Sequence, residues 1–211
     1  MRSLFPDSTP PPGEIERALK ASGLTLLVGV DEAGRGALCG PVAAAAVALP
    51  PGARIPGLHD SKLLSPAQRE AAAAAVLDVA LASGVGMAGA EEIDEKNILN
   101  ATFLAMRRAL AAALPSLPRT PDLVLVDGPH AIRELMLAQK PVVKGDRRSL
   151  NIAAASVLAK TRRDRLMAEL ASAYPGYGLE VHMGYGTKAH LAALASLGPS
   201  PIHRRTFLHI S

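Results

Sequence analysis

The chain has 211 residues, of which 49% are hydrophobic, so it is long and apolar enough to bury a sizeable core. Its single cysteine excludes an internal disulfide, and the sequence has no Cys/His cluster with the spacing of a zinc site. The first 13 residues carry four prolines and no long apolar run, so we expect neither a signal peptide nor a membrane span there.

The net charge of +4 is unevenly distributed along the chain. Residues 132–211 hold 12 of the 23 lysines and arginines but only 5 of the 19 acids. A basic third beside an acidic part is typical of a protein that grips a polyanion, with phosphate contacts at Lys188, Arg204 and Arg205. A solvated basic surface is the alternative explanation.

Periodicity and turn residues predict an alternation of strands and helices after a Pro-rich leader. The expected helices span residues 14–22, 65–83, 93–114, 131–139, 152–171 and 188–197. The expected strands span residues 24–31, 42–49, 84–89, 121–127 and 141–144. The first two are joined by a short connection, so we expect them to pair antiparallel. We found no internal repeat.

The first strand has an unusual ending, because its apolar run leads directly into Asp31 and Glu32. Alternation places Asp31 on the strand face opposite Val28 and Val30. A carboxylate at the end of a buried run is expensive to desolvate unless a cation or hydrogen bonds compensate it. Residues 34–36 follow as Gly-Arg-Gly, and their glycines let the backbone approach a ligand closely. An ordinary strand-ending turn is the simpler alternative for an isolated Asp-Glu pair.

Two later strands repeat this pattern. Asp127 follows the apolar run 121–126, and Asp146 follows the short strand 141–144. If these strands lie beside the first in one sheet, their carboxylates converge and repel one another, and a divalent cation resolves that repulsion. Asp31 and Glu32 are adjacent, so in an ideal strand only one of their side chains points into the site.

Three further features have both a functional and a structural explanation. Lys62 precedes a helix, where it can meet a phosphate or simply be solvated. Residues 84–89 match G-x-G-x-x-G, but they follow a helix and enter a strand, so we reject a dinucleotide site in favour of tight strand packing. Tyr185 lies in a Gly-rich basic segment, where it can stack on nucleic acid or pack the C-terminal part onto the core.

Taken together, the ordered motifs resemble those of bacterial ribonuclease HII over residues 24–208. These motifs are Asp31-Glu32-Ala33-Gly34-Arg35-Gly36, Asp60-Ser61-Lys62, Val126-Asp127-Gly128, Lys144-Gly145-Asp146, the helix segment 152–160, Gly184-Tyr185-Gly186-Thr187 and Ser200-Pro201-Ile202-His203-Arg204. The sequence departs from the expected pattern at Ala37, Cys39 and Pro129, none of which is an acid.

The resemblance implies an α/β protein with a ribonuclease H-like fold, a five-stranded mixed sheet flanked by helices, and a C-terminal helical extension. It divides the chain into a leader and short helix (1–23), a catalytic core (24–172) and an extension that contacts substrate (173–211). The implied enzyme is a cytoplasmic, monomeric endonuclease that does not bind membranes. Its implied substrates are RNA–DNA hybrids and DNA duplexes with embedded ribonucleotides, cut 5′ of the ribonucleotide to leave 3′-hydroxyl and 5′-phosphate ends.

The resemblance also assigns the site. It implies that Mn²⁺ or Mg²⁺ is held by Asp31, Glu32, Asp127 and Asp146, which are also the catalytic residues. It implies that substrate is bound by Gly34, Arg35, Gly36, Lys62 and Tyr185.

Two other function classes remain open from the residues alone. A junction resolvase or a nucleotidyl-transferase of similar fold would use equivalent acids, and a non-catalytic hybrid-binding module would need no clustered acids. We find neither a plausible Ser-His-Asp set nor a P-loop in the sequence.

Overall fold

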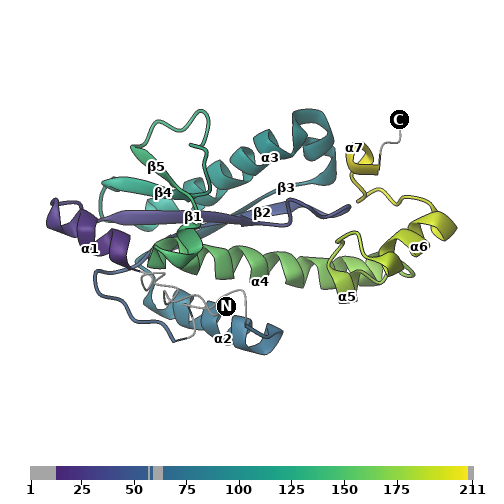
Figure 1. The fold of residues 1–211 in the computed structure, drawn as a ribbon, viewed down its shortest axis with the longest axis horizontal. Coiled ribbons are helices and arrows are strands. Elements are labelled where there is room, and N and C mark those ends of the chain that lie inside the picture. The colour runs from purple at the N-terminus through teal and green to yellow at the C-terminus, as the bar shows by residue number, and fades with distance from the viewer. Residues whose placement is uncertain (1–12, 57, 59–63, 209–211) are drawn as a thin grey trace, which may run out of the picture.

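A five-stranded mixed sheet lies at the centre of the molecule, in the order β3-β2-β1-β4-β5 (Figure 1). The computed structural model describes residues 13–56, 58 and 64–208. The strands are β1 (Leu27–Ala33), β2 (Val42–Ala48), β3 (Ala82–Ala88), β4 (Leu123–Asp127) and β5 (Gln139–Val142). The pairs β1–β2 and β2–β3 are antiparallel, whereas β1–β4 and β4–β5 are parallel. The expected five-stranded mixed sheet and the antiparallel first pair are therefore confirmed.

Helices cover both faces of this sheet. The α-helices that precede the C-terminal extension are α1 (Glu14–Ala21), α2 (Pro66–Val79), α3 (Ala90–Ala113) and α4 (Leu150–Ala173). In Figure 1, α3 lies on one side of the sheet, and α4 with α2 lies on the other. The extension after α4 contains α5 (Leu179–His182), α6 (Lys188–Leu197) and α7 (Arg205–Leu208). No helix in the described part of the chain is long and apolar enough to cross a membrane.

Strand β1 follows the predicted alternation. Val28 and Val30 pack into the cluster beneath α3, and Leu27 packs into a cluster with Ile152 of α4. Gly29 also faces α4, so that Asp31, the next residue on that face, points toward the same helix. The predicted alternation of β1, with Asp31 on the face opposite Val28 and Val30, is therefore confirmed.

Small residues let the helices approach the sheet closely. A Cβ atom at Gly29 would lie 2.2 Å from the backbone carbon of Asn151 in α4. On the other face, Cβ atoms at Gly84 and Gly86 would lie 2.3 Å from backbone oxygens of α3. The first two glycines of the rejected dinucleotide motif therefore serve tight strand packing, as predicted, whereas the third, Gly89, lies at the start of α3 with open space around it.

Residues 131–138 form a loop that leads into β5, and the prediction of a helix over 131–139 is wrong. The side chain of Gln139 donates to the carbonyl oxygen of Ile132 at 2.9 Å and accepts from its amide at 2.7 Å. Ile132 is buried in the core beneath α3, so the loop is anchored by packing and by these two bonds rather than by a helix. The last strand is also displaced, because β5 runs over Gln139–Val142 and Lys144 adopts a left-handed conformation.

The close approach of β1 and α4 predicts a large penalty for adding one methyl group. We expect Gly29→Ala to lower the free energy of unfolding by about 3 kcal/mol, because the new atom meets backbone, which cannot rotate away. Urea unfolding followed by circular dichroism measures this change. Gly89→Ala is the matched control, since Gly89 has open space around it and an extended backbone. Equal stability of the two variants would contradict the close packing of β1 on α4.

Candidate active site

Two acids lie at the same level of the sheet on neighbouring parallel strands. Val30 of β1 pairs with Val126 of β4, and the next residue on each strand is an acid, Asp31 or Asp127. Asp31 is buried, with 5% of its surface exposed. It does not end its strand as expected, because β1 continues to Ala33 in its pairing with β2. The parallel pairing nevertheless ends there, and this opens the edge of the sheet at the two carboxylates.

The electrostatics of this edge are those of crowded carboxylates. Burial raises the pKa of Asp31 well above its ordinary value, and the nearby charges of Glu32 and Asp127 raise it further. Hydrogen bonds from Ser156 of α4 and from the backbone of Glu32 act in the opposite direction. The pKa of Glu32 is raised by burial and by Asp127, although Arg35 lowers it through an ion pair at 3.3 Å. Asp31, Glu32 and Asp127 therefore act electrostatically as one group.

Asp146 reaches this edge through a tight turn after β5. The amide of Gly145 donates to the Oδ1 atom of Asp127 at 2.7 Å, and Asp146 is the next residue. A Cβ at Gly145 would lie 2.5 Å from the end of the Ile152 side chain and 3.1 Å from the same carboxylate oxygen, so a larger residue would displace Ile152 and crowd Asp127. Asp146 itself is buried. The turn thus carries a fourth acid to the end of β4.

The Gly-Arg-Gly loop and Tyr185 line a pocket of about 430 Å³ beside the acids. Glu32, Ser156, Lys160 and Arg69 contribute to its walls. Tyr185 is half-buried, and its backbone forms a β-bridge with Ala37 at the end of the loop. The guanidinium of Arg163 lies 5.4 Å and the ammonium of Lys160 lies 5.6 Å from the centre of its ring. Loop and tyrosine, 150 residues apart in sequence, therefore share one surface.

Two buried arginines hold the loop from below. Arg204 donates to the carbonyl oxygens of Gly34, Arg35 and Gly40 at 2.8 to 3.0 Å. Arg163 donates to carbonyl oxygens on both sides of the junction between loop and extension, at Cys39, Pro41 and Met183. The prediction that Arg204 contacts phosphate is therefore wrong, because its guanidinium is fully buried against main-chain oxygens. Charge counting cannot distinguish such an arginine from a solvated one.

The other predicted basic contacts have different outcomes. Lys188 and Arg205 are exposed and stay predictions. Lys62 lies outside the described residues, as does most of the Pro-rich leader. Sequence reasoning missed Ser156, Lys160 and Arg163, although their spacing of four and three residues along α4 places them on one helical face. Three polar residues at helical spacing, in a helix that is otherwise rich in alanine, were the feature of the sequence that could have identified them.

Comparison with known proteins identifies the family. Residues 28–210 match the family model described as Ribonuclease HII. This chain belongs to the ribonuclease HII family. The Ribonuclease HII of Geobacter sulfurreducens is 50% identical to it over 203 residues, which cover 95% of this chain and 91% of that protein. The chain is accordingly an endoribonuclease, a hydrolase of the ribonuclease H class that acts on RNA–DNA hybrids.

Solved structures agree with this assignment. The RNase HII in the PCNA:RNase HII complex from Archaeoglobus fulgidus has a TM-score of 0.71 and 25% identity, covering 88% of this chain and 95% of that one. Bst-RNase HIII, solved in complex with Mn²⁺, has a TM-score of 0.65 and 20% identity, covering 86% of this chain and 66% of that one. The ribonuclease H-like fold is thereby confirmed.

The buried setting of Arg204 predicts a stability effect that its exposed neighbour lacks. We expect Arg204→Lys to lower the free energy of unfolding by about 3 kcal/mol, because an ammonium group cannot reach the carbonyls that the planar guanidinium serves. Arg205→Lys, one residue away but exposed, should change it by less than about 0.5 kcal/mol. Thermal unfolding of the pair checks this, and equal melting temperatures would show that Arg204 does not support the loop.

Proposed function

We propose that this ribonuclease HII family member is a divalent-metal-dependent endonuclease that also cuts single ribonucleotides embedded in duplex DNA. The observation that carries the proposal is the register of β1 and β4, which sets Asp31 and Asp127 side by side with Glu32 and the Asp146 turn next to them. The cut falls on the 5′ side of the ribonucleotide and leaves a 3′-hydroxyl and a 5′-phosphate.

The acids fit a hard divalent cation. They offer only oxygen donors, and burial, together with the neighbouring carboxylate of Asp127, raises the pKa values of Asp31 and Glu32, a penalty on negative charge that a bound cation would offset. We therefore assign Asp31, Glu32, Asp127 and Asp146 as the residues that hold Mg²⁺ or Mn²⁺. Bound there, the cation would supply the positive charge that activates water and stabilises the leaving oxygen. The Mn²⁺ complex of the structurally similar Bst-RNase HIII supports this choice.

The remaining pocket residues position the substrate strand. Arg35 is half-exposed at the pocket, where its planar guanidinium can donate two parallel hydrogen bonds to a phosphate. The backbone at Gly36 can approach a 2′-hydroxyl closely because no Cβ intervenes and the space beside it is open. Gly34, where a Cβ would meet the side chain of Arg163, lets the loop turn at the edge of the same pocket. Ser156 donates to Asp31 and so orients that carboxylate. Tyr185 presents its ring to the sugar or base at the RNA–DNA junction.

The extension, residues 173–211, completes the substrate surface in this proposal. Exposed Lys188 and Arg205 contact phosphates of the duplex, and Lys62 contacts the strand near the cut. Residues 24–172 supply the catalytic core, and residues 1–23 form its leader and first helix. The protein acts as a monomer in the cytoplasm, where its one buried cysteine stays reduced.

The direct test is cleavage of a DNA duplex that holds one ribonucleotide. With Mg²⁺ or Mn²⁺ we expect a single nick 5′ of the ribonucleotide, and with a chelator we expect none. An all-DNA duplex of the same sequence is the control. Binding without cleavage under every metal condition would favour a non-catalytic hybrid-binding module, and cleavage of the all-DNA duplex would favour a resolvase.

Asp127→Asn tests the assigned metal site. We expect cleavage to fall by more than about 100-fold while duplex binding is kept, because the variant loses a ligand charge but repels phosphate less. The amide oxygen can still accept from Gly145, so the turn before Asp146 stays in place. Asp78→Asn on the exposed face of α2 is the control. Near-normal turnover of Asp127→Asn at saturating Mg²⁺ would remove Asp127 from the site.

Tyr185 variants separate substrate contact from packing. We expect Tyr185→Ala to remain folded and to lose cleavage of single-ribonucleotide duplexes by about 100-fold, with Tyr185→Phe losing less because its ring still stacks. Activity per folded molecule, measured well below the melting temperature, distinguishes substrate contact from packing. An early-melting Tyr185→Ala variant that cuts the junction normally would assign the residue to packing alone.

A further inference from the structure

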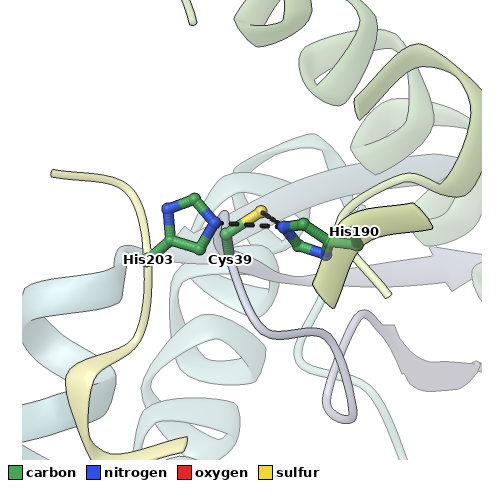
Figure 2. Close-up of side chains that lie close together, drawn as sticks. All are labelled: Cys39, His190 and His203. Carbon is green, nitrogen blue, oxygen red and sulfur yellow. Dashed lines mark hydrogen bonds between the residues drawn. The ribbon is translucent and has the colours of Figure 1, made fainter. Parts of the chain in front are cut away.

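A chain of hydrogen bonds runs through the extension and ends at the main chain of Tyr185. His203 and His190 are both buried, and their Nε2 atoms lie 3.1 Å apart (Figure 2). Beyond them, the Nδ1 atom of His190 lies 3.0 Å from the carbonyl oxygen of Tyr185. At the other end, the Nδ1 atom of His203 lies 3.0 Å from the amide nitrogen of Ser200.

The donor and acceptor of each hydrogen bond in this series follow from the bond between Ser200 and His203. A backbone amide can only donate, and the amide of Ser200 points at the Nδ1 atom of His203, which is therefore unprotonated. The Ser200 hydroxyl lies 2.8 Å from the same nitrogen and, beside this amide, acts there as a second donor. The neutral His203 ring therefore carries its proton on Nε2 and donates to His190. His190 accepts at Nε2, so its own proton lies on Nδ1 and is donated to Tyr185.

Burial keeps the imidazole rings of His190 and His203 neutral, as this series of hydrogen bonds requires. The pKa of His203 is lowered to about 4, first by burial and then by His190. The pKa of His190 is lowered in the same way, by burial first and by His182 to a smaller extent. His182 stacks on the His190 ring with centroids 4.4 Å apart, which leaves His190 little freedom to rotate.

We propose that His190 is a positioning residue for substrate recognition, with its tautomer selected by His203. Its Nδ1–H bond holds the main chain of Tyr185 and thereby sets where the ring meets the RNA–DNA junction; this rests on the proposed function. The amide of Thr187 also donates to the Tyr185 carbonyl, at 2.8 Å. That bond is local to the turn, whereas His190 ties the turn to α6 and, through His203, to the segment around residue 200.

A metal site is the competing explanation for the same side chains. The Sγ atom of Cys39 and the Nε2 atoms of His190 and His203 lie within 4.8 Å of one another (Figure 2). The tautomers oppose it, because the Nε2 atom of His203 carries a proton where a ligand needs a lone pair. The electrostatics oppose it as well, because the buried guanidinium of Arg163 donates to the carbonyl oxygen of Cys39 at 3.2 Å.

The tautomers can be measured without any substrate. Long-range ¹H–¹⁵N spectra of the histidine rings should show the proton of His190 on Nδ1 and that of His203 on Nε2. The reverse arrangement would overturn the proposal. Binding of one equivalent of Zn²⁺ that shifts both rings and disappears in Cys39→Ala would also overturn it, in favour of the metal site.

Two substitutions of His190 separate positioning from filling space. In His190→Asn the amide nitrogen lies near the original Nδ1 position and can still donate to Tyr185. In His190→Gln the amide lies near Nε2 and faces His203 instead. Gln fills the larger volume, so a merely structural role predicts that it is the better replacement. Positioning predicts the opposite order.

The readout is kcat/KM on a single-ribonucleotide duplex and on a continuous RNA–DNA hybrid. We expect His190→Gln to lose about 10-fold on the first and less than about 3-fold on the second, and His190→Asn to lose less than about 3-fold on both. Tyr177→Phe is the control, since it removes a 2.7 Å bond from the same extension to the Gly198 carbonyl without touching Tyr185. It should be active on both substrates.

The outcomes keep this inference separate from the function on which it rests. If the unmodified protein fails to cut the single-ribonucleotide duplex, the proposed function fails, while the tautomers can still be tested. If it cuts normally and His190→Gln is at least as active as His190→Asn on that duplex, the positioning role is wrong. Equal losses on both substrates in all three variants, including Tyr177→Phe, would show a general effect of stability and would also contradict it.

Discussion

The parallel pairing of β1 with β4 is the constraint on which the site depends. These strands are almost 100 residues apart in sequence, and their register alone decides that Asp31 and Asp127 meet. A shift of one residue would turn one of the acids to the opposite face of the sheet. Strand β1 also packs closely on α4, where Gly29 leaves no room for a side chain. The same helix brings Ser156 to Asp31, so the helix that packs on β1 also donates a hydrogen bond to the carboxylate of that strand.

The acids and the loop were predictable from sequence because their signals are local. A carboxylate directly after a buried run, or an arginine between two glycines, can be recognised without knowing the fold. The pairing of the strands could be stated only as a condition, and the structure meets it. The helix expected at 131–139 failed because its decisive contacts, between Gln139 and the backbone of Ile132, depend on where the loop crosses the core.

The supporting residues were not predictable for a different physical reason. Arg204 lies in a basic stretch beside Arg205, and composition treats the two alike, yet one is buried and the other exposed. What separates them is a set of main-chain carbonyl oxygens that come from a loop far away in sequence. The histidines of the extension show the same limitation, since their roles follow from which nitrogen carries a proton. Neither fact has a signature in the order of the residues.

The hydrogen bonds from Arg204 to the loop determine when, during synthesis of the chain, the candidate site can form. The carbonyl oxygens of residues 34–40 are translated about 165 residues before Arg204, which binds them. At ordinary rates of synthesis this separation lasts roughly 10 s. Until Arg163 is made the loop lacks both guanidinium partners, and from then until Arg204 is made it lacks one, although the strands that carry Asp31 and Asp127 have by that time been made. A nascent chain on the ribosome can therefore contain all four acids before it contains the arginine that holds the Gly-Arg-Gly loop.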